Sequence, residues 1–226
     1  MDTTILYTEA GVATQIMISA EDNHFIVDVG DGSLRDLLNL KVDLGKIKGI
    51  FLTHGHYDHI GRLYALLGHF RVMERKEPIE MYYPEGCKEC PQIINAFKTS
   101  YNDLSFKINI HEVTGQDEVE LNNVKIKIYQ MKHYAAVGVN QILHPDSAVG
   151  YRFNYKGKSV AISGDTGLCP GLIELVQGAD FALIDSTLDK NEVTEELLEK
   201  LHLSRERAED IGKLAKKFIP IHQHKT

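Results

Sequence analysis

The chain has 226 residues, a net charge of −7, 43% hydrophobic residues and 25% charged residues. This composition suits a globular protein large enough to bury a core without disulfides, and it shows no basic footprint of a nucleic-acid-binding protein at the level of the whole chain. No apolar stretch reaches the ~18 residues of a membrane helix, and the first residues lack the pattern of a signal peptide, so neither a membrane partner nor secretion is expected.

Predicted elements alternate between strands and helices along the chain. In the first half, strands are predicted at 13–19, 24–30, 47–53, 79–83 and 106–113, and helices at 33–40, 59–70 and 91–100. In the second half, strands are predicted at 121–131, 180–185 and 218–222, and the stretch 149–164 is predicted to form two strands joined by a turn at 156–158. Helices are predicted there at 169–179, 192–201 and 204–217. Helices interleaved with strands predict an α/β fold with helices outside the sheets. Without a linker or a repeat, one domain over residues 1–226 is expected.

The cysteines are few and odd in number, Cys87, Cys90 and Cys169. Such a count without a secretory signal predicts a reducing compartment, here the cytoplasm. The "CKEC" run is a single CxxC, whereas a structural zinc site needs four ligands. We interpret these two residues as incidental cysteines where a loop leads into a helix.

The run "HGHYDH" crowds His54, His56, Asp58 and His59 into the loop after a buried strand. Gly55 lets the backbone bend closely there. Imidazole nitrogens and carboxylate oxygens suit zinc, and also iron or manganese. Four residues on one tight loop will not all reach a single ion, so two adjacent ions are expected, each completed from elsewhere in the chain.

Three further polar residues follow predicted strands and are candidates to complete the sites: His133, Asp165 and His222. A single histidine at a strand end is more often a surface residue, so the argument depends on all three accompanying the loop. His224 competes with His222 for the last position. His222 is preferred because it directly follows the apolar run.

The motif "THGHYDH" resembles the HxHxDH signature of the metallo-β-lactamase superfamily, and the order of the seven candidates matches the ligand order of that superfamily. The resemblance extends from "FIVDVGDG" to "IPIH". It implies a four-layer αββα sandwich that binds two divalent metal ions, with zinc as the preferred metal. It assigns the ligands as follows: His54, His56 and His133 to one ion, Asp58, His59 and His222 to the other, and Asp165 as the bridge. The metals would generate a hydroxide near neutral pH, and Asp58 could orient it or take its proton.

Two further stretches, "ADFALIDST" and "HLSRERAEDIGKLAKK", resemble the ribonuclease Z branch of this superfamily. The resemblance implies that His202, just before the second of two predicted helices, donates a proton or stabilises phosphorane-like charge. A histidine is suited to both tasks. The alternative is that His202 is an ordinary residue at a helix entry.

The chain departs from that branch in one respect. Ribonuclease Z enzymes carry a long arm that grips transfer RNA between the positions of His133 and Asp165, which here lie only 32 positions apart. We therefore expect a phosphodiesterase acting on small phosphodiesters and not on tRNA. One alternative is a lactonase or glyoxalase II-like thioester hydrolase, which shares the ligands but lacks the histidine and serine that open a helix, here His202 and Ser204. Another is a non-catalytic metal-binding module. A homodimer is compatible with the sequence, but no residues mark an interface.

Overall fold

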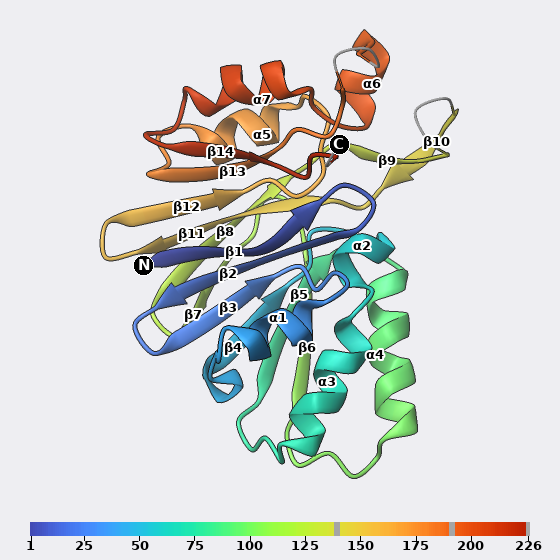
Figure 1. Ribbon diagram of the computed structural model, residues 1–226, viewed down its shortest axis with the longest axis vertical. Coiled ribbons are helices and arrows are strands. Elements are labelled where there is room, and N and C mark those ends of the chain that lie inside the picture. The colour runs from blue at the N-terminus through green and yellow to red at the C-terminus, as the bar shows by residue number, and fades with distance from the viewer. Residues whose placement is uncertain (138–140, 190–192, 225–226) are drawn as a thin grey trace. The chain divides into compact units, whose positions relative to one another are not determined.

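The computed structural model describes residues 1–137, 141–189 and 193–224. The chain divides into two compact units, Met1–Glu112 and Val113–Thr226, called here the N-terminal and C-terminal units. Each unit is built around a six-stranded sheet with its own helices (Figure 1). Among the described residues, no helix is both long enough and apolar enough to cross a bilayer.

The sheet of the N-terminal unit follows the order of the chain. Its strands are β1 (Asp2–Glu9), β2 (Ala13–Ala20), β3 (Asn23–Val27), β4 (Ile47–Phe51), β5 (Ile79–Pro84) and β6 (Ile108–Val113). The first three strands pair antiparallel, whereas β3, β4 and β5 run parallel. Parallel strands end at the same edge of a sheet, so the loops that follow β3 and β4 start close together.

Helices of the N-terminal unit cover its sheet with apolar faces. They are α1 (Ser33–Asn39), the short α2 (Tyr57–Ile60), α3 (Leu63–Val72) and α4 (Glu89–Ser100), with a 3₁₀ turn η1 at Leu44–Lys46. Fully buried residues such as Leu37, Leu67 and Phe97 pack in one cluster with Ile26 and Ile50 of the strands. Burial of these side chains provides the main driving force for the packing of helices on the sheet.

One helix was predicted over 59–70, and the structure divides it into α2 and α3. The amide of Arg62 donates to the carbonyl of Val29, 2.9 Å away, instead of continuing the helical ladder. The short α2 therefore belongs to the loop that carries the histidines, and α3 begins afresh at Leu63.

The C-terminal unit holds a second mixed sheet in the order β14-β13-β12-β11-β8-β7. Its strands are β7 (Glu118–Leu121), β8 (Val124–Gln130), β11 (Val149–Tyr155), β12 (Lys158–Ile162), β13 (Phe181–Asp185) and β14 (Phe218–Ile221). The strands β12, β13 and β14 are parallel, and the other pairs are antiparallel. A separate two-stranded ribbon consists of β9 (His133–Val137) and β10 (Gln141–Asp146).

The helices of this unit are α5 (Pro170–Val176), α6 (Glu195–Lys200) and α7 (Arg205–Gly212), and α5 and α7 lie side by side in Figure 1. Pro170 stands in the first turn of α5, where its missing N–H has no helical partner to lose. The side chain of Ser204 caps α7 by accepting a hydrogen bond from the Arg207 amide. Leu172, Ala182 and Ile211 share the core of the unit.

Several predicted boundaries were wrong for identifiable reasons. The predicted helix 204–217 ends at Gly212, because the amides of Lys216 and Ala182 pair with the carbonyls of Ala179 and Lys217 at the edge of the sheet. The predicted helix 192–201 begins only at Glu195, and 190–192 lie outside the described residues.

The strands β1, β7, β9 and β10 were not predicted. Asn122 and Asn123, at positive φ, form a two-residue hairpin turn, so the predicted strand 121–131 begins only at Val124, as β8. The predicted α/β class is confirmed, whereas a single domain over 1–226 stays a prediction.

Candidate metal centre

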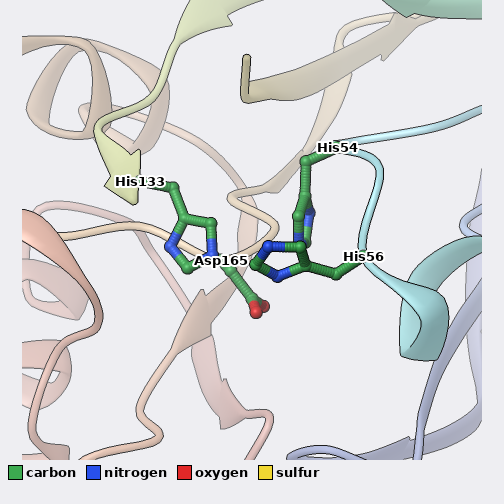
Figure 2. A group of neighbouring side chains, drawn as sticks. All are labelled: His54, His56, His133 and Asp165. Carbon is green, nitrogen blue, oxygen red and sulfur yellow. The ribbon is translucent and has the colours of Figure 1, made fainter. Parts of the chain in front are cut away.

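The loop after β4, together with the short α2 that follows it, carries the histidine cluster of the N-terminal unit, with His54, His56, Asp58 and His59. Figure 2 shows His54 and His56 on this loop, drawn together with His133 and Asp165 of the C-terminal unit. Three of the four loop side chains are buried, His54 at 0%, Asp58 at 5% and His59 at 0% exposure. The His54 ring centroid lies 4.5 Å from that of His56 and 4.1 Å from that of His59. One short loop therefore brings these imidazoles together away from bulk solvent.

Asp28, directly after β3, holds this loop in place. Its Oδ1 accepts a hydrogen bond from the Thr53 amide at 2.8 Å, and its Oδ2 accepts one from the Thr53 hydroxyl at 2.8 Å. The same Oδ2 lies 2.7 Å from Nδ1 of His59, and both side chains are fully buried. A carboxylate bound at Nδ1 places the proton there and leaves the lone pair of Nε2 for a metal.

Asp58 is oriented by the turn between β1 and β2. The Gly11 amide donates to Oδ2 of Asp58 at 3.0 Å, and the Tyr57 hydroxyl donates to the Gly11 carbonyl at 2.7 Å. Oδ2 of Asp58 also lies 3.9 Å from Nε2 of His59. The carboxylate and the imidazole therefore face the same small volume, as two ligands of one ion would.

In the C-terminal unit the candidates follow the parallel strands β12, β13 and β14. Asp165 comes shortly after β12, Asp185 ends β13, and His222 follows β14. All three are buried, at 3%, 0% and 3% exposure. His222 has a φ of 60°, which turns the chain sharply at the end of the last strand. Asp165, Asp185, His202 and His222 each place a ligand atom within 4.8 Å of the others.

His202 is held by the buried carboxylate of Asp185, and its own side chain is partly exposed. Its Nδ1 lies 3.0 Å from Oδ2 of Asp185 and 3.9 Å from Oδ2 of Asp165. The amides of Thr166 and Leu203 also donate to Oδ2 of Asp185, at 3.1 and 3.4 Å. These backbone donors, together with the amide and hydroxyl of Thr187 that donate to Oδ1, hold the Asp185 carboxylate so that it fixes the orientation of the imidazole.

His133 and His222 have similarly fixed rings. Nδ1 of His133 lies 2.8 Å from the Leu201 carbonyl, which can only accept, so Nδ1 carries the proton and Nε2 the lone pair. Nδ1 of His222 lies 2.8 Å from the Thr187 hydroxyl and 3.4 Å from Oδ1 of Asp165. His224, the competing candidate, is exposed. The burial of His222 supports its choice as the last ligand.

The sequence reasoning missed two residues of the site, Asp28 and Asp185. Both are acidic residues at the last positions of apolar strand-forming runs, "FIVD" and "FALID". An acidic residue that ends a buried strand is a signal that could have found them, since it would be costly to bury without a partner. Each instead binds the Nδ1 atom of a candidate histidine.

Comparisons with known proteins show the family to which the chain belongs. Residues 26–223 match the family described as the Beta-lactamase superfamily domain. Ribonuclease Z of Methanothermobacter thermautotrophicus is 26% identical over 269 residues, which cover 98% of this chain and 86% of the relative.

Two solved structures have the same fold. The crystal structure of human tRNase Z, short form, superposes with a TM-score of 0.82 at 24% identity, covering 100% of this chain and 93% of that one. A diphosphatase of the PhnP family superposes with a TM-score of 0.70 at 19% identity, covering 98% and 86% of the two chains. Both likenesses lie below 25% identity and show the fold alone.

The chain belongs to the β-lactamase superfamily, and the predicted metallo-β-lactamase fold is confirmed. Within this superfamily it is a ribonuclease Z-like, metal-dependent hydrolase. The fold and the candidate ligands support a dinuclear site for divalent ions.

Proposed function

We propose that this chain is a dinuclear phosphodiesterase that cleaves small phosphodiesters. We assign one ion to His54, His56 and His133, the second to Asp58, His59 and His222, and the bridge to Asp165. The fit rests on donor chemistry: neutral imidazoles with Nδ1 bound elsewhere, and buried carboxylates, suit zinc, with manganese or iron as alternatives. Bound ions would supply a nucleophile near neutral pH and positive charge for the phosphate oxygens.

The chain's own residues would then divide two tasks. Asp58, oriented by the Gly11 amide, would position the attacking water and accept its proton. His202, held at Nδ1 by Asp185, would present Nε2 to the leaving oxygen and donate a proton to it. Both residues have the fixed rotamers that proton transfer in a defined direction needs.

The observation that carries the proposal is the Asp185–His202 pair beside Asp165. Leaving oxygens of phosphodiesters depart as anions and benefit from a proton donor or a positive charge at the phosphate. The ligands alone would serve a lactonase or a thioester hydrolase equally well. A buried carboxylate that fixes an extra histidine next to a ligand is the feature that favours phosphodiesters.

Substrate size follows from the segment between His133 and Asp165. The strands β9, β10, β11 and β12 occupy it, and only 138–140 in this interval lie outside the described residues. This leaves no length for the long arm expected of an enzyme that grips transfer RNA. The net charge of −7 also opposes a polyanionic substrate. We place the enzyme in the cytoplasm, in keeping with its three unpaired cysteines.

The test compares substrate classes on the zinc-loaded protein. We expect turnover of bis-para-nitrophenyl phosphate, and little turnover of a lactone, a thioester or a tRNA precursor. Asp58→Asn should abolish phosphodiester turnover while circular dichroism shows a folded chain. Preferential lactone or thioester hydrolysis would contradict the phosphodiesterase assignment, efficient tRNA cleavage would contradict the small substrate, and no turnover of any class would favour a non-catalytic metal-binding module.

A further inference from the structure

The CxxC of the N-terminal unit brings two thiols together beneath the histidine loop. Cys87 precedes α4 and Cys90 lies in its first turn, with 3.2 Å between the two sulfur atoms. Both side chains are buried, Cys87 at 7% and Cys90 at 0% exposure. A disulfide has a sulfur–sulfur distance of about 2.05 Å, so closing the bond needs a movement on the order of 1 Å.

The two thiols differ in a way that suits sequential oxidation. Cys87 keeps a small exposed fraction and precedes the N-terminus of a helix of 12 residues, where a thiolate is favoured. The hydrogen bond between the two thiols lowers the pKa of Cys87, whereas the pKa of Cys90 is raised by the same hydrogen bond and by burial. Cys87 is therefore the thiol that attacks, and Cys90 the thiol that resolves.

The pair also supports the metal-binding loop. A Cβ atom on Gly55 would lie 3.1 Å from the Cys87 sulfur and 2.5 Å from Oε2 of Glu89, so the loop backbone packs directly on these side chains. Glu89 is in turn bound by the Lys88 amide at 3.1 Å. Gly55 lies between His54 and His56. A shift of the Cys87 sulfur would therefore move the backbone that positions both histidines.

We propose that Cys87 and Cys90 form a reversible disulfide that weakens metal binding by the loop at His54 and His56. A hydroperoxide is the oxidant: the Cys87 thiolate attacks its O–O bond, giving a sulfenic acid and, with a proton, an alcohol or water. The Cys90 thiol then displaces water from that sulfenic acid and closes the S–S bond. The two sulfur atoms lose two electrons, the hydroperoxide gains them, and an exchange with reduced dithiol reverses the step. The coupling to metal rests on the proposed ligands, whereas the disulfide does not.

The experiment treats the full chain with hydrogen peroxide, removes the peroxide, and reads two quantities. Intact mass should fall by two hydrogen atoms, and peptide mapping should find Cys87 linked to Cys90. Zinc affinity, measured by chelator competition, should weaken about tenfold on oxidation and recover with dithiothreitol, a size typical of changes next to metal ligands. Cys169→Ser, altered in the other unit, should behave as wild type, whereas Cys87→Ser should show neither change.

Peptide mapping uses the wild-type chain alone, so the test stays valid even if the Cys87→Ser protein misfolds. Unlinked cysteines after peroxide would overturn the proposal, and so would a disulfide that leaves zinc affinity unchanged. A chain that forms the disulfide but binds no zinc in either state would refute the metal assignments of the proposed function and the coupling, and would leave the disulfide established.

Discussion

At the scale of single residues, one device recurs around the candidate ligands: an acceptor fixes Nδ1 of a histidine. Asp28 does so for His59 at 2.7 Å, and Asp185 for His202 at 3.0 Å. The backbone carbonyl of Leu201 does so for His133 at 2.8 Å. Fixing Nδ1 decides the tautomer and the ring orientation, which together decide what Nε2 can bind or donate to.

Replacing His202 tests the proton donor. We expect His202→Ala to lower phosphodiester turnover by about 10²–10⁴-fold, because a positioned acid contributes this much, and to leave the zinc content unchanged. Asp185→Asn, which keeps the imidazole but changes its anchor, should cost less and should move the alkaline limb of the pH–rate profile. Both effects are measured by assaying turnover of bis-para-nitrophenyl phosphate as a function of pH.

His224→Ala is the matched control, since His224 is a nearby histidine that is exposed. It should keep wild-type turnover. A His202→Ala enzyme that turns over as fast as wild type would remove His202 from the mechanism and leave it as a residue at the entry to α7.

At the scale of elements, one side chain links the parallel strands of the C-terminal unit near their N-terminal ends, whereas the candidate ligands follow their C-terminal ends. Asp180, just before β13, accepts from the Ser159 amide of β12 at 2.8 Å. Its other oxygen lies 2.7 Å from Nζ of Lys216, in the segment that leads into β14. One carboxylate thus connects the three strands whose far ends carry Asp165, Asp185 and His222.

Asp180→Asn tests this connection through pH. The hydrogen bonds from Lys216 and the Ser159 amide hold the pKa of Asp180 below its ordinary value. A carboxyl group with a lowered folded-state pKa stabilises the fold above its unfolded pKa of about 3.9, and this stability is lost as pH falls through the folded value. We expect Asp180→Asn to lower the free energy of unfolding by about 1 kcal/mol at pH 7 and by less at pH 3.

Urea unfolding at the two pH values measures this difference. Asp210→Asn serves as the control, because Asp210 also pairs with a lysine, Lys213 at 2.7 Å, but on the surface of one helix turn. It should have little effect at either pH. An Asp180→Asn effect that is equally large at pH 3 would assign the loss to packing and not to the charge.

At the scale of the whole molecule, the proposed ligands come from both halves of the chain. The N-terminal unit holds His54, His56, Asp58 and His59 on one loop, and the C-terminal unit holds the others at its strand ends. Under the proposed assignment, each ion takes ligands from both units. Metal binding should therefore stabilise the folded chain as a whole.

Metal removal tests this proposal. We expect two divalent ions per chain by elemental analysis of protein purified without chelator, and loss of phosphodiester turnover after dialysis against a chelator. Zinc at about 100 times its dissociation constant adds about 2.7 kcal/mol per site, which should raise Tm by about 5 °C or more. Fewer than one ion per chain, or an unchanged Tm on adding zinc, would refute the two-ion assignment.

Much of the fold was predictable where local pattern and final packing agree. Val124, Ile126 and Ile128 alternate in the sequence and are buried on one face of β8. Predictions failed where distant chain segments decide the outcome, as at Arg62, whose amide bonds to Val29, and after Gly212, where the chain turns to join β13. The half-buried edge strand β1 shows no clear alternation, and its pairing with β2 is what makes it a strand.

The sequence by itself determined the chemistry of the candidate centre, because metal-binding side chains at this spacing in one loop are specific whatever surrounds them. Only the tertiary structure decided which groups control those side chains. Asp28 lies 31 positions from His59, and Asp185 lies 17 from His202, so neither pairing follows from local pattern. The same holds for "CKEC": the sequence suggested incidental cysteines, and the approach of Gly55 to Cys87 placed them against the metal-binding loop. Contacts between residues distant in sequence depend on the order and register in which strands pair in a sheet, and no short stretch of sequence encodes these.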